Sequence, residues 1–158
     1  MPKHFPLILL AATLNAEYRQ IDIQVKDLDC ASCVTSLTGS LKKIRGVEKV
    51  EIGVADGSVR LLLAAENKVT LEQVRDKIKG AGFTPRDAKV VVRGKPVTDS
   101  GRWQFTIEGA NQTYLLTTSD NGLIAKLQGG GMVTVDGVCP AMENPRDQPI
   151  LDVKGVRE

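Results

Sequence analysis

Two of the three cysteines in the chain, Cys30 and Cys33, lie only three residues apart. Before them, Ile21, Ile23 and Val25 alternate with polar residues, which is typical of a half-buried strand, whereas apolar residues after Cys33 repeat with helical spacing. Free N–H groups at a helix start stabilise thiolates, and thiolates are soft ligands for Cu(I), Zn(II), Cd(II) or Hg(II). The pattern predicts a two-sulfur site on an exposed loop, suited to an ion that is passed on rather than to a four-ligand structural zinc.

The same cysteine pair is compatible with two other classes of function. A thiol–disulfide redox protein would cycle the pair between dithiol and disulfide. A thioredoxin-like protein, however, needs a different strand order around the motif, and no aromatic residue precedes Cys30. A structural envelope module with a decayed metal site is the third alternative. Uptake of a soft metal by the reduced protein, lost in Cys30→Ser, separates the first class from the others.

The elements that must position the pair can be predicted from periodicity. Strand, helix, strand, strand, helix and strand follow one another from residue 19 to 93, with a hairpin turn at Asp56-Gly57 and a capping box at Thr70–Gln73. This order predicts an α+β chain with a ferredoxin-like βαββαβ domain over residues 17–93.

The remaining residues have a different pattern. Residues 94–100, "GKPVTDS", have the composition of a linker. Residues 101–158 then predict a small all-β domain of five strands, an OB-like barrel, with a two-sheet sandwich as the alternative. The five expected strands are "RWQFTIEG", "QTYLLTT", "LIAKLQ", "MVTVDGV" and "ILDVKGVRE".

Residues 1–16 have the layout of a secretory signal peptide, with a weakly basic start and the apolar stretch "FPLILLAATL". A buried N-terminal strand or helix is the alternative. Export predicts a periplasmic or secreted protein, and no other stretch approaches membrane-spanning length. It would also remove His4, the only histidine, which excludes Ser-His-Asp and Cys-His catalysis in the mature chain. We therefore expect no enzyme activity.

Charge and composition exclude one class of partner. Acidic and basic residues nearly cancel at a net charge of +2, and only 4% of residues are aromatic. A nucleic-acid-binding protein usually has a basic excess and aromatic residues on which bases stack. No nucleic-acid partner is expected.

Residues 19–93 resemble the heavy-metal-associated domain family. The family pattern is Gly-Met-x-Cys-x-x-Cys between the first strand and first helix; here Asp27 replaces the glycine and Leu28 the methionine, and "AGF" at 81–83 matches a later loop. The family includes copper chaperones, the periplasmic mercury-binding protein and the N-terminal domains of metal-transporting P-type ATPases. The resemblance implies that Cys30 and Cys33 bind one metal ion and pass it to such an ATPase or another metal-handling protein, with Leu28 as a buried anchor.

Asp29 bears on which metal is bound. Copper-handling members usually have threonine at this position, and aspartate is similar to members that handle zinc, cadmium or lead. A carboxylate would add a harder third ligand for a divalent ion, whereas linear Cu(I) does not need one. Alternatively, Asp29 points to solvent. The sequence leaves Cu+ and the Zn2+/Cd2+/Hg2+ class open.

Other residues have weaker functional interpretations. Cys139 and Met142, with Met132, could form an accessory soft-metal site, but a lone cysteine is more often a small buried hydrophobe. The basic end of the first helix, residues 42–45 with Lys42, Lys43 and Arg45, could dock an acidic partner, although cations also complement a helix C-terminus.

Overall fold

The structure is a computed structural model that describes residues 16–157. The expected signal peptide lies outside the described residues except for Ala16, and so does His4. No helix among residues 16–157 is long and apolar enough to cross a membrane.

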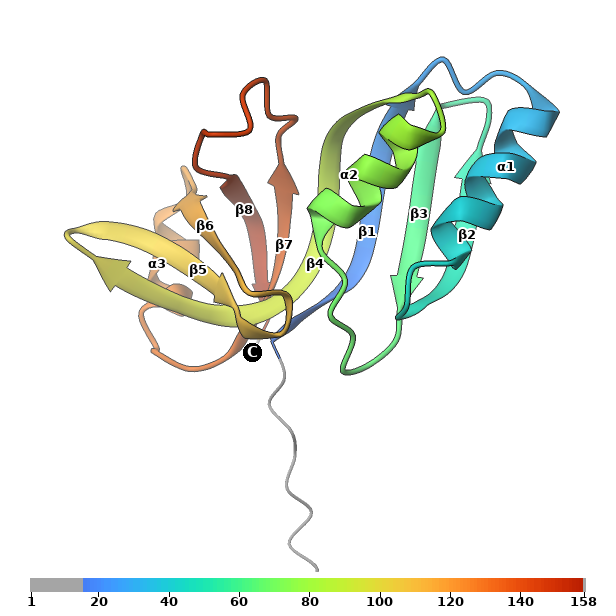
Figure 1. Ribbon diagram of the computed structural model, residues 1–158. Helices are drawn as coiled ribbons and strands as arrows, with labels where there is room; N and C mark the ends of the chain where they lie inside the picture. The colour runs from blue at the N-terminus through green and yellow to red at the C-terminus, as the bar shows by residue number, and fades with distance from the viewer. Residues whose placement is uncertain (1–15, 158) are drawn as a thin grey trace, which may run out of the picture.

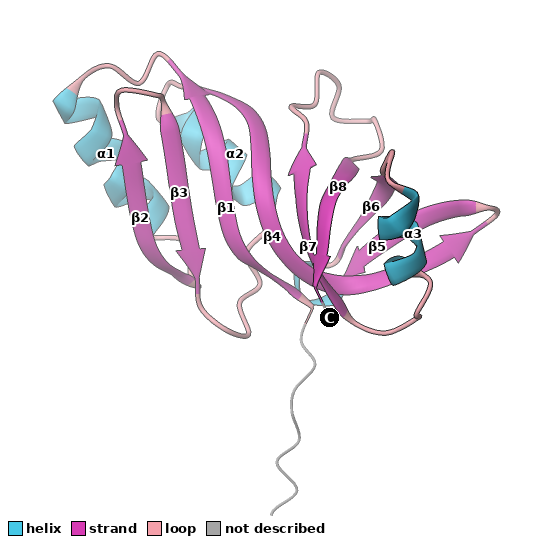
Figure 2. Cartoon of the chain, turned by 180° about the vertical axis from the view of Figure 1, so that it is seen from behind, coloured by secondary structure: helices cyan, strands magenta, loops and turns pink. Residues whose placement is uncertain are grey.

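The N-terminal region has the predicted ferredoxin-like arrangement (Figure 1). Its strands are antiparallel neighbours in the order β2-β3-β1-β4. Helices α1 and α2 cover one face of this sheet, as the two opposite views show (Figures 1 and 2). The elements are β1 (Glu17–Lys26), α1 (Ala31–Lys42), β2 (Val47–Gly53), β3 (Ser58–Leu63), α2 (Leu71–Gly80) and β4 (Thr84–Asp99).

Both helices are placed by apolar stripes and by their caps. Helix α1 buries Leu37 and Leu41 completely. Helix α2 begins with the predicted capping box, in which Thr70 Oγ1 accepts the N–H of Gln73 at 3.1 Å and Gln73 Oε1 accepts the N–H of Thr70 at 3.1 Å. The capping box fixes where α2 starts, and the buried leucines fix how α1 lies on the sheet.

The expected linker at 94–100 is wrong, because β4 continues as a strand to Asp99. Residues 88–94 of β4 pair with β7, and residues 95–99 pair with β5. A side chain at Gly94 would come within 2.5 Å of the Phe105 ring and 2.6 Å of Thr106 O. Glycine at this position therefore permits close packing against the next strand rather than a flexible connection.

The second half of the chain closes a ring of strand pairings. Around the ring, β4 pairs with β5, β5 with β6, β6 with β8 in parallel, β8 with β7, and β7 again with β4. β4 thus belongs both to the ferredoxin-like sheet and to the ring (Figure 1). The elements are β5 (Arg102–Ile107), a 3-10 turn (Glu108–Ala110), β6 (Gln112–Thr117), α3 (Asn121–Leu127), β7 (Val133–Cys139) and β8 (Ile150–Arg157).

One expected strand is a helix. The stretch "LIAKLQ" forms most of α3 and its C-cap residue, Gln128, and the N-cap Asp120 accepts the N–H of Gly122 at 2.8 Å. Leu123 and Leu127 are four residues apart and both turn toward the core. A short apolar run fits either type of element, and here the capping aspartate favours the helix.

Candidate metal site

The loop after β1 brings the sulfur atoms of Cys30 and Cys33 together. Cys30 is the N-cap of α1, and its Sγ accepts the backbone N–H of Cys33 at 3.1 Å. The two cysteines are joined by a disulfide, with their Cα atoms 5.2 Å apart, and both are half-buried. The predicted convergence of the two sulfurs at the start of a helix is thus present, in its oxidised form.

Leu28 and Asp27 shape this loop. Leu28 is only 4% exposed, which fits its expected position as the buried anchor. Asp27 has φ of +67°, in the left-handed region that favours glycine, and this is the position at which the family pattern has glycine. Aspartate tolerates this conformation better than most residues. The departure from the pattern therefore keeps the same backbone turn.

Asp29 does not gather with the cysteines into a larger cluster. It is exposed and makes no hydrogen bond within the described part of the chain. No group of three or more His, Cys, Asp or Glu side chains among residues 16–157 is placed to hold a metal ion. The disulfide offers no thiolate, so the two sulfurs can act as metal ligands only in the reduced protein. Participation of Asp29 stays a prediction.

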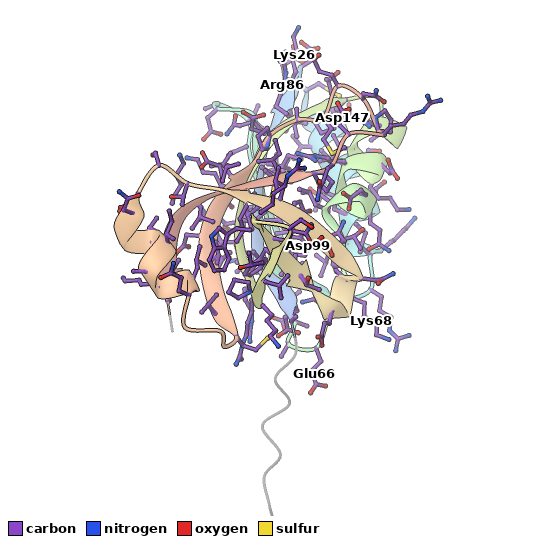
Figure 3. All side chains as sticks on the ribbon, turned by 90° about the vertical axis from the view of Figure 1, so that its left-hand side faces the viewer. Lys26, Glu66, Lys68, Arg86, Asp99 and Asp147 are labelled. Atoms are coloured by element: carbon purple, nitrogen blue, oxygen red, sulfur yellow. A yellow bond between two sulfur atoms is a disulfide. The ribbon has the colours of Figure 1, made fainter. Side chains whose placement is uncertain are left out.

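The basic residues considered as a possible docking surface lie away from the cysteines. Lys42, Lys43 and Arg45 are exposed at the C-terminal end of α1, whereas Cys33 lies in its first turn. A helix of this length separates its ends by roughly 18 Å. In Figure 3, Lys26, the last residue of β1 before the cysteine loop, lies at one end of the molecule, and Lys68 lies toward the opposite end.

Cys139 lies in a different environment from the other two cysteines. It is a free thiol, 2% exposed, at the end of β7. Burial raises the pKa of this thiol to about 12, so it is protonated at neutral pH. Met132 packs against the core and Met142 is half-buried. A protonated, buried thiol does not favour the accessory-site interpretation.

A buried polar network, which we did not predict, joins the ferredoxin-like unit to the ring. Tyr18 in β1 donates its hydroxyl proton to Gln112 Oε1 at 2.9 Å, so the hydroxyl of Tyr114 in β6 is the donor in its hydrogen bond to Tyr18. Burial raises the pKa of both tyrosines, so both stay neutral. From α2, Arg75 Nη2 donates to the carbonyls of Cys139 and Pro140, each at 3.0 Å. In the sequence these residues are indistinguishable from ordinary strand and helix positions.

Comparison with known families identifies the first half of the chain. Residues 22–84 match the family model described as "Heavy-metal-associated domain". This segment is a heavy-metal-associated domain, although the match covers less than half of the 158 residues. Such a domain implies binding of a heavy-metal ion, and the paired cysteines that this needs are present at positions 30 and 33.

A comparison with solved structures gives matches to less than half of the chain. The CopZ metallochaperone is 24% identical, with a TM-score of 0.40, over 42% of this chain and 97% of that chain. The yeast copper transporter domain CCC2A is 21% identical, with a TM-score of 0.40, over 46% and 93%. Oxidised MerP from Ralstonia metallidurans CH34 is 16% identical, with a TM-score of 0.40, over 43% and 93%. No curated protein gives a match.

Proposed function

We propose that the protein is a carrier of one soft or borderline metal ion, Cu+ or an ion of the Zn2+/Cd2+/Hg2+ class. In the reduced protein, Cys30 and Cys33 hold the ion as thiolates. The observation that carries the proposal is the convergence of the two sulfurs at the start of α1, with Cys30 as its N-cap. The helix N–H groups and dipole favour negative charge at that point.

A site of two sulfurs at a half-buried loop suits an ion that is passed on. A structural zinc is normally enclosed by four protein ligands, which leaves no position for an acceptor. Here the part of the chain between residues 16 and 157 offers the two sulfurs without such a cage. We therefore propose delivery of the ion to a metal-transporting P-type ATPase or another metal-handling protein, without catalytic turnover.

The proposal includes export to the periplasm or beyond the cell, which rests on the signal-peptide pattern of residues 1–16. It also includes a role for the second half as an OB-like barrel. Its ring order β4-β5-β6-β8-β7 supports that barrel, with one long shared strand and a helix between β6 and β7. Because such barrels host unrelated functions, we assign this half no more than a spacing or docking role.

Competitive titration of the fully reduced protein tests the metal proposal. The protein is titrated with Cu(I), Zn(II), Cd(II) or Hg(II), each in competition with a chelator of known affinity. We expect one equivalent to bind to the natural protein and none to bind with comparable affinity to Cys30→Ser. Cys139→Ser is the matched control and should retain the full equivalent. A reduced, folded protein that takes up none of the four ions would contradict the proposal.

The disulfide favours a second candidate, a thiol–disulfide redox protein that uses the same pair. Its test is reduction of insulin disulfides by the metal-free protein. A useful rate that is lost in Cys30→Ser would support this candidate, and a rate no faster than that of a small thiol would remove it.

A further inference from the structure

The two sulfurs of the disulfide lie in unlike surroundings. Cys30 Sγ is within 3.1 Å of the backbone N–H of Cys33 and 3.4 Å from the hydroxyl of Ser32. A disulfide sulfur has no proton, so Ser32 must be the donor in this contact. Cys33 Sγ accepts no hydrogen bond from residues 16–157. Two donors are therefore directed at one sulfur of the bond and none at the other.

This asymmetry matters when the disulfide opens. In thiol–disulfide exchange, one sulfur is attacked and the other departs with the electron pair, and a better stabilised leaving sulfur departs faster. Hydrogen bonds to an anionic acceptor are stronger than those to a neutral one, so both donors gain strength as charge develops on Cys30. The position of Cys30 at the N-terminus of α1 acts in the same direction. Both cysteines are half-buried.

We propose that an external thiol opens the site by attacking Cys33 Sγ, and that Ser32 is a positioning residue that stabilises the departing Cys30 sulfur. The thiolate of the reductant forms a new S–S bond with Cys33 while the Cys30–Cys33 bond breaks, and Cys30 leaves as a thiolate. A second reductant thiolate then attacks the reductant sulfur of the mixed disulfide and releases Cys33. The protein gains two electrons, and the reductant is oxidised to its disulfide.

This step goes beyond the proposed metal carriage and is required by both candidate functions. A metal ion can be held by both sulfurs only after Cys33 has been released. A thiol that remains on Cys33 therefore keeps the site closed to the ion while Cys30 is already free. A monothiol at low concentration releases Cys33 slowly and would delay metal uptake. A dithiol would release Cys33 faster, because its second thiol attacks the mixed disulfide within the same molecule.

Trapping of the mixed disulfide tests which sulfur is attacked. The oxidised full chain is mixed with reduced glutathione, quenched in acid, alkylated with N-ethylmaleimide at acidic pH and digested with trypsin. The peptide of residues 27–42 contains both cysteines, while Cys139 falls in another peptide, residues 127–146. We expect glutathione on Cys33 and maleimide on Cys30, in about tenfold excess over the reverse pattern. Glutathione mainly on Cys30, or divided evenly, would overturn the proposal.

Variants of two serines test the role of the hydroxyl. Ser32→Ala should slow opening by about three- to tenfold, because one hydrogen bond to the leaving sulfur is lost. Ser32→Thr keeps a hydroxyl and should restore most of the rate. Ser36→Ala, one turn further along α1 and equally exposed, is the matched control and should open at the natural rate. A natural opening rate in Ser32→Ala would refute its role.

Metal titration of the reduced variants separates this inference from the metal proposal. Reduced Ser32→Ala should still bind one equivalent of metal, because both cysteines remain. A protein that binds no metal but opens at Cys33 would overturn the metal proposal alone. A protein that binds metal but opens at Cys30 would overturn the inference alone.

Discussion

The three cysteines of this chain occupy two contrasting environments. Cys30 and Cys33 lie on a half-buried loop at the start of a helix, where local N–H groups favour negative sulfur. Cys139 ends a strand of the ring, 2% exposed, and burial raises the pKa of its thiol to about 12. We therefore expect the same side chain to be reactive in one half of the molecule and unreactive in the other. Whether a thiol reacts depends on its burial and on its position relative to a helix end, because all three residues are of the same type.

The separation of Cys139 from the other two cysteines would matter in an oxidising compartment. A third accessible thiol could exchange with the Cys30–Cys33 disulfide and leave one functional cysteine trapped in the wrong bond. Because Cys139 is 2% exposed, its thiol could take part in such an exchange only after the fold has opened.

The largest expected effect concerns thiol reactivity. When the reduced protein is treated with iodoacetamide at pH 8, Cys30 and Cys33 should react first, and Cys139 slower by a factor on the order of 1000 or more. Because the thiolate is the reactive form and the pKa of Cys139 is about 12, its rate should rise about tenfold per pH unit between pH 8 and 10. Peptide mass spectrometry over time measures both rates. Three thiols that react at similar rates would contradict the contrast.

The next largest effect is expected on stability, when the buried polar network between the ferredoxin-like unit and the ring is changed. Tyr114→Phe removes a buried hydroxyl and leaves the Tyr18 hydroxyl with one partner fewer, at an expected cost of about 1–3 kcal/mol in the free energy of unfolding. Thr113→Ala, an exposed neighbour on β6, is the control and should change stability by less than about 0.5 kcal/mol. Urea unfolding measures both variants. Equal stability of the tyrosine variant and the control would show that the network does not hold the junction.

Asp29→Thr tests whether a carboxylate contributes to the metal site. If Asp29 moves to the ion in the reduced protein, zinc affinity should fall about tenfold while Cu(I) affinity stays the same, since a hard oxygen ligand assists divalent ions. Competitive titration measures the two affinities, with Asp147→Thr in the β7–β8 loop as the control. Figure 3 shows Asp147 at the same end of the molecule as Lys26. Unchanged zinc affinity would discard the carboxylate ligand.

The smallest effect concerns the loop backbone. Asp27 has φ of +67°, so Asp27→Gly should stabilise the protein by up to about 1 kcal/mol, whereas Asp27→Ala should destabilise it by about 1 kcal/mol. Thermal unfolding of both variants measures the difference. Metal affinity should be the same in each, because the turn is retained. A destabilised glycine variant would mean that the aspartate side chain supports the loop.

Local patterns predicted the parts of the molecule that depend on local interactions. The spacing of Cys30 and Cys33, the capping box at Thr70 and the turn at Gly57 depend only on nearby residues, and the structure contains the corresponding elements. Gly94 indicated a linker because the sequence does not distinguish a glycine that packs against the ring of Phe105 in the next strand from a flexible one. The hydroxyl contact between Tyr18 and Tyr114 likewise depends on strands that are far apart in the chain.

X-ray absorption spectroscopy of the zinc-loaded, reduced protein tests the central claim most directly. We expect two sulfur neighbours of the zinc ion at about 2.3 Å, both retained in Cys139→Ser and one lost in Cys30→Ser. A spectrum with only nitrogen and oxygen neighbours, or one that loses a sulfur when Cys139 is replaced, would contradict the claim that Cys30 and Cys33 form the site.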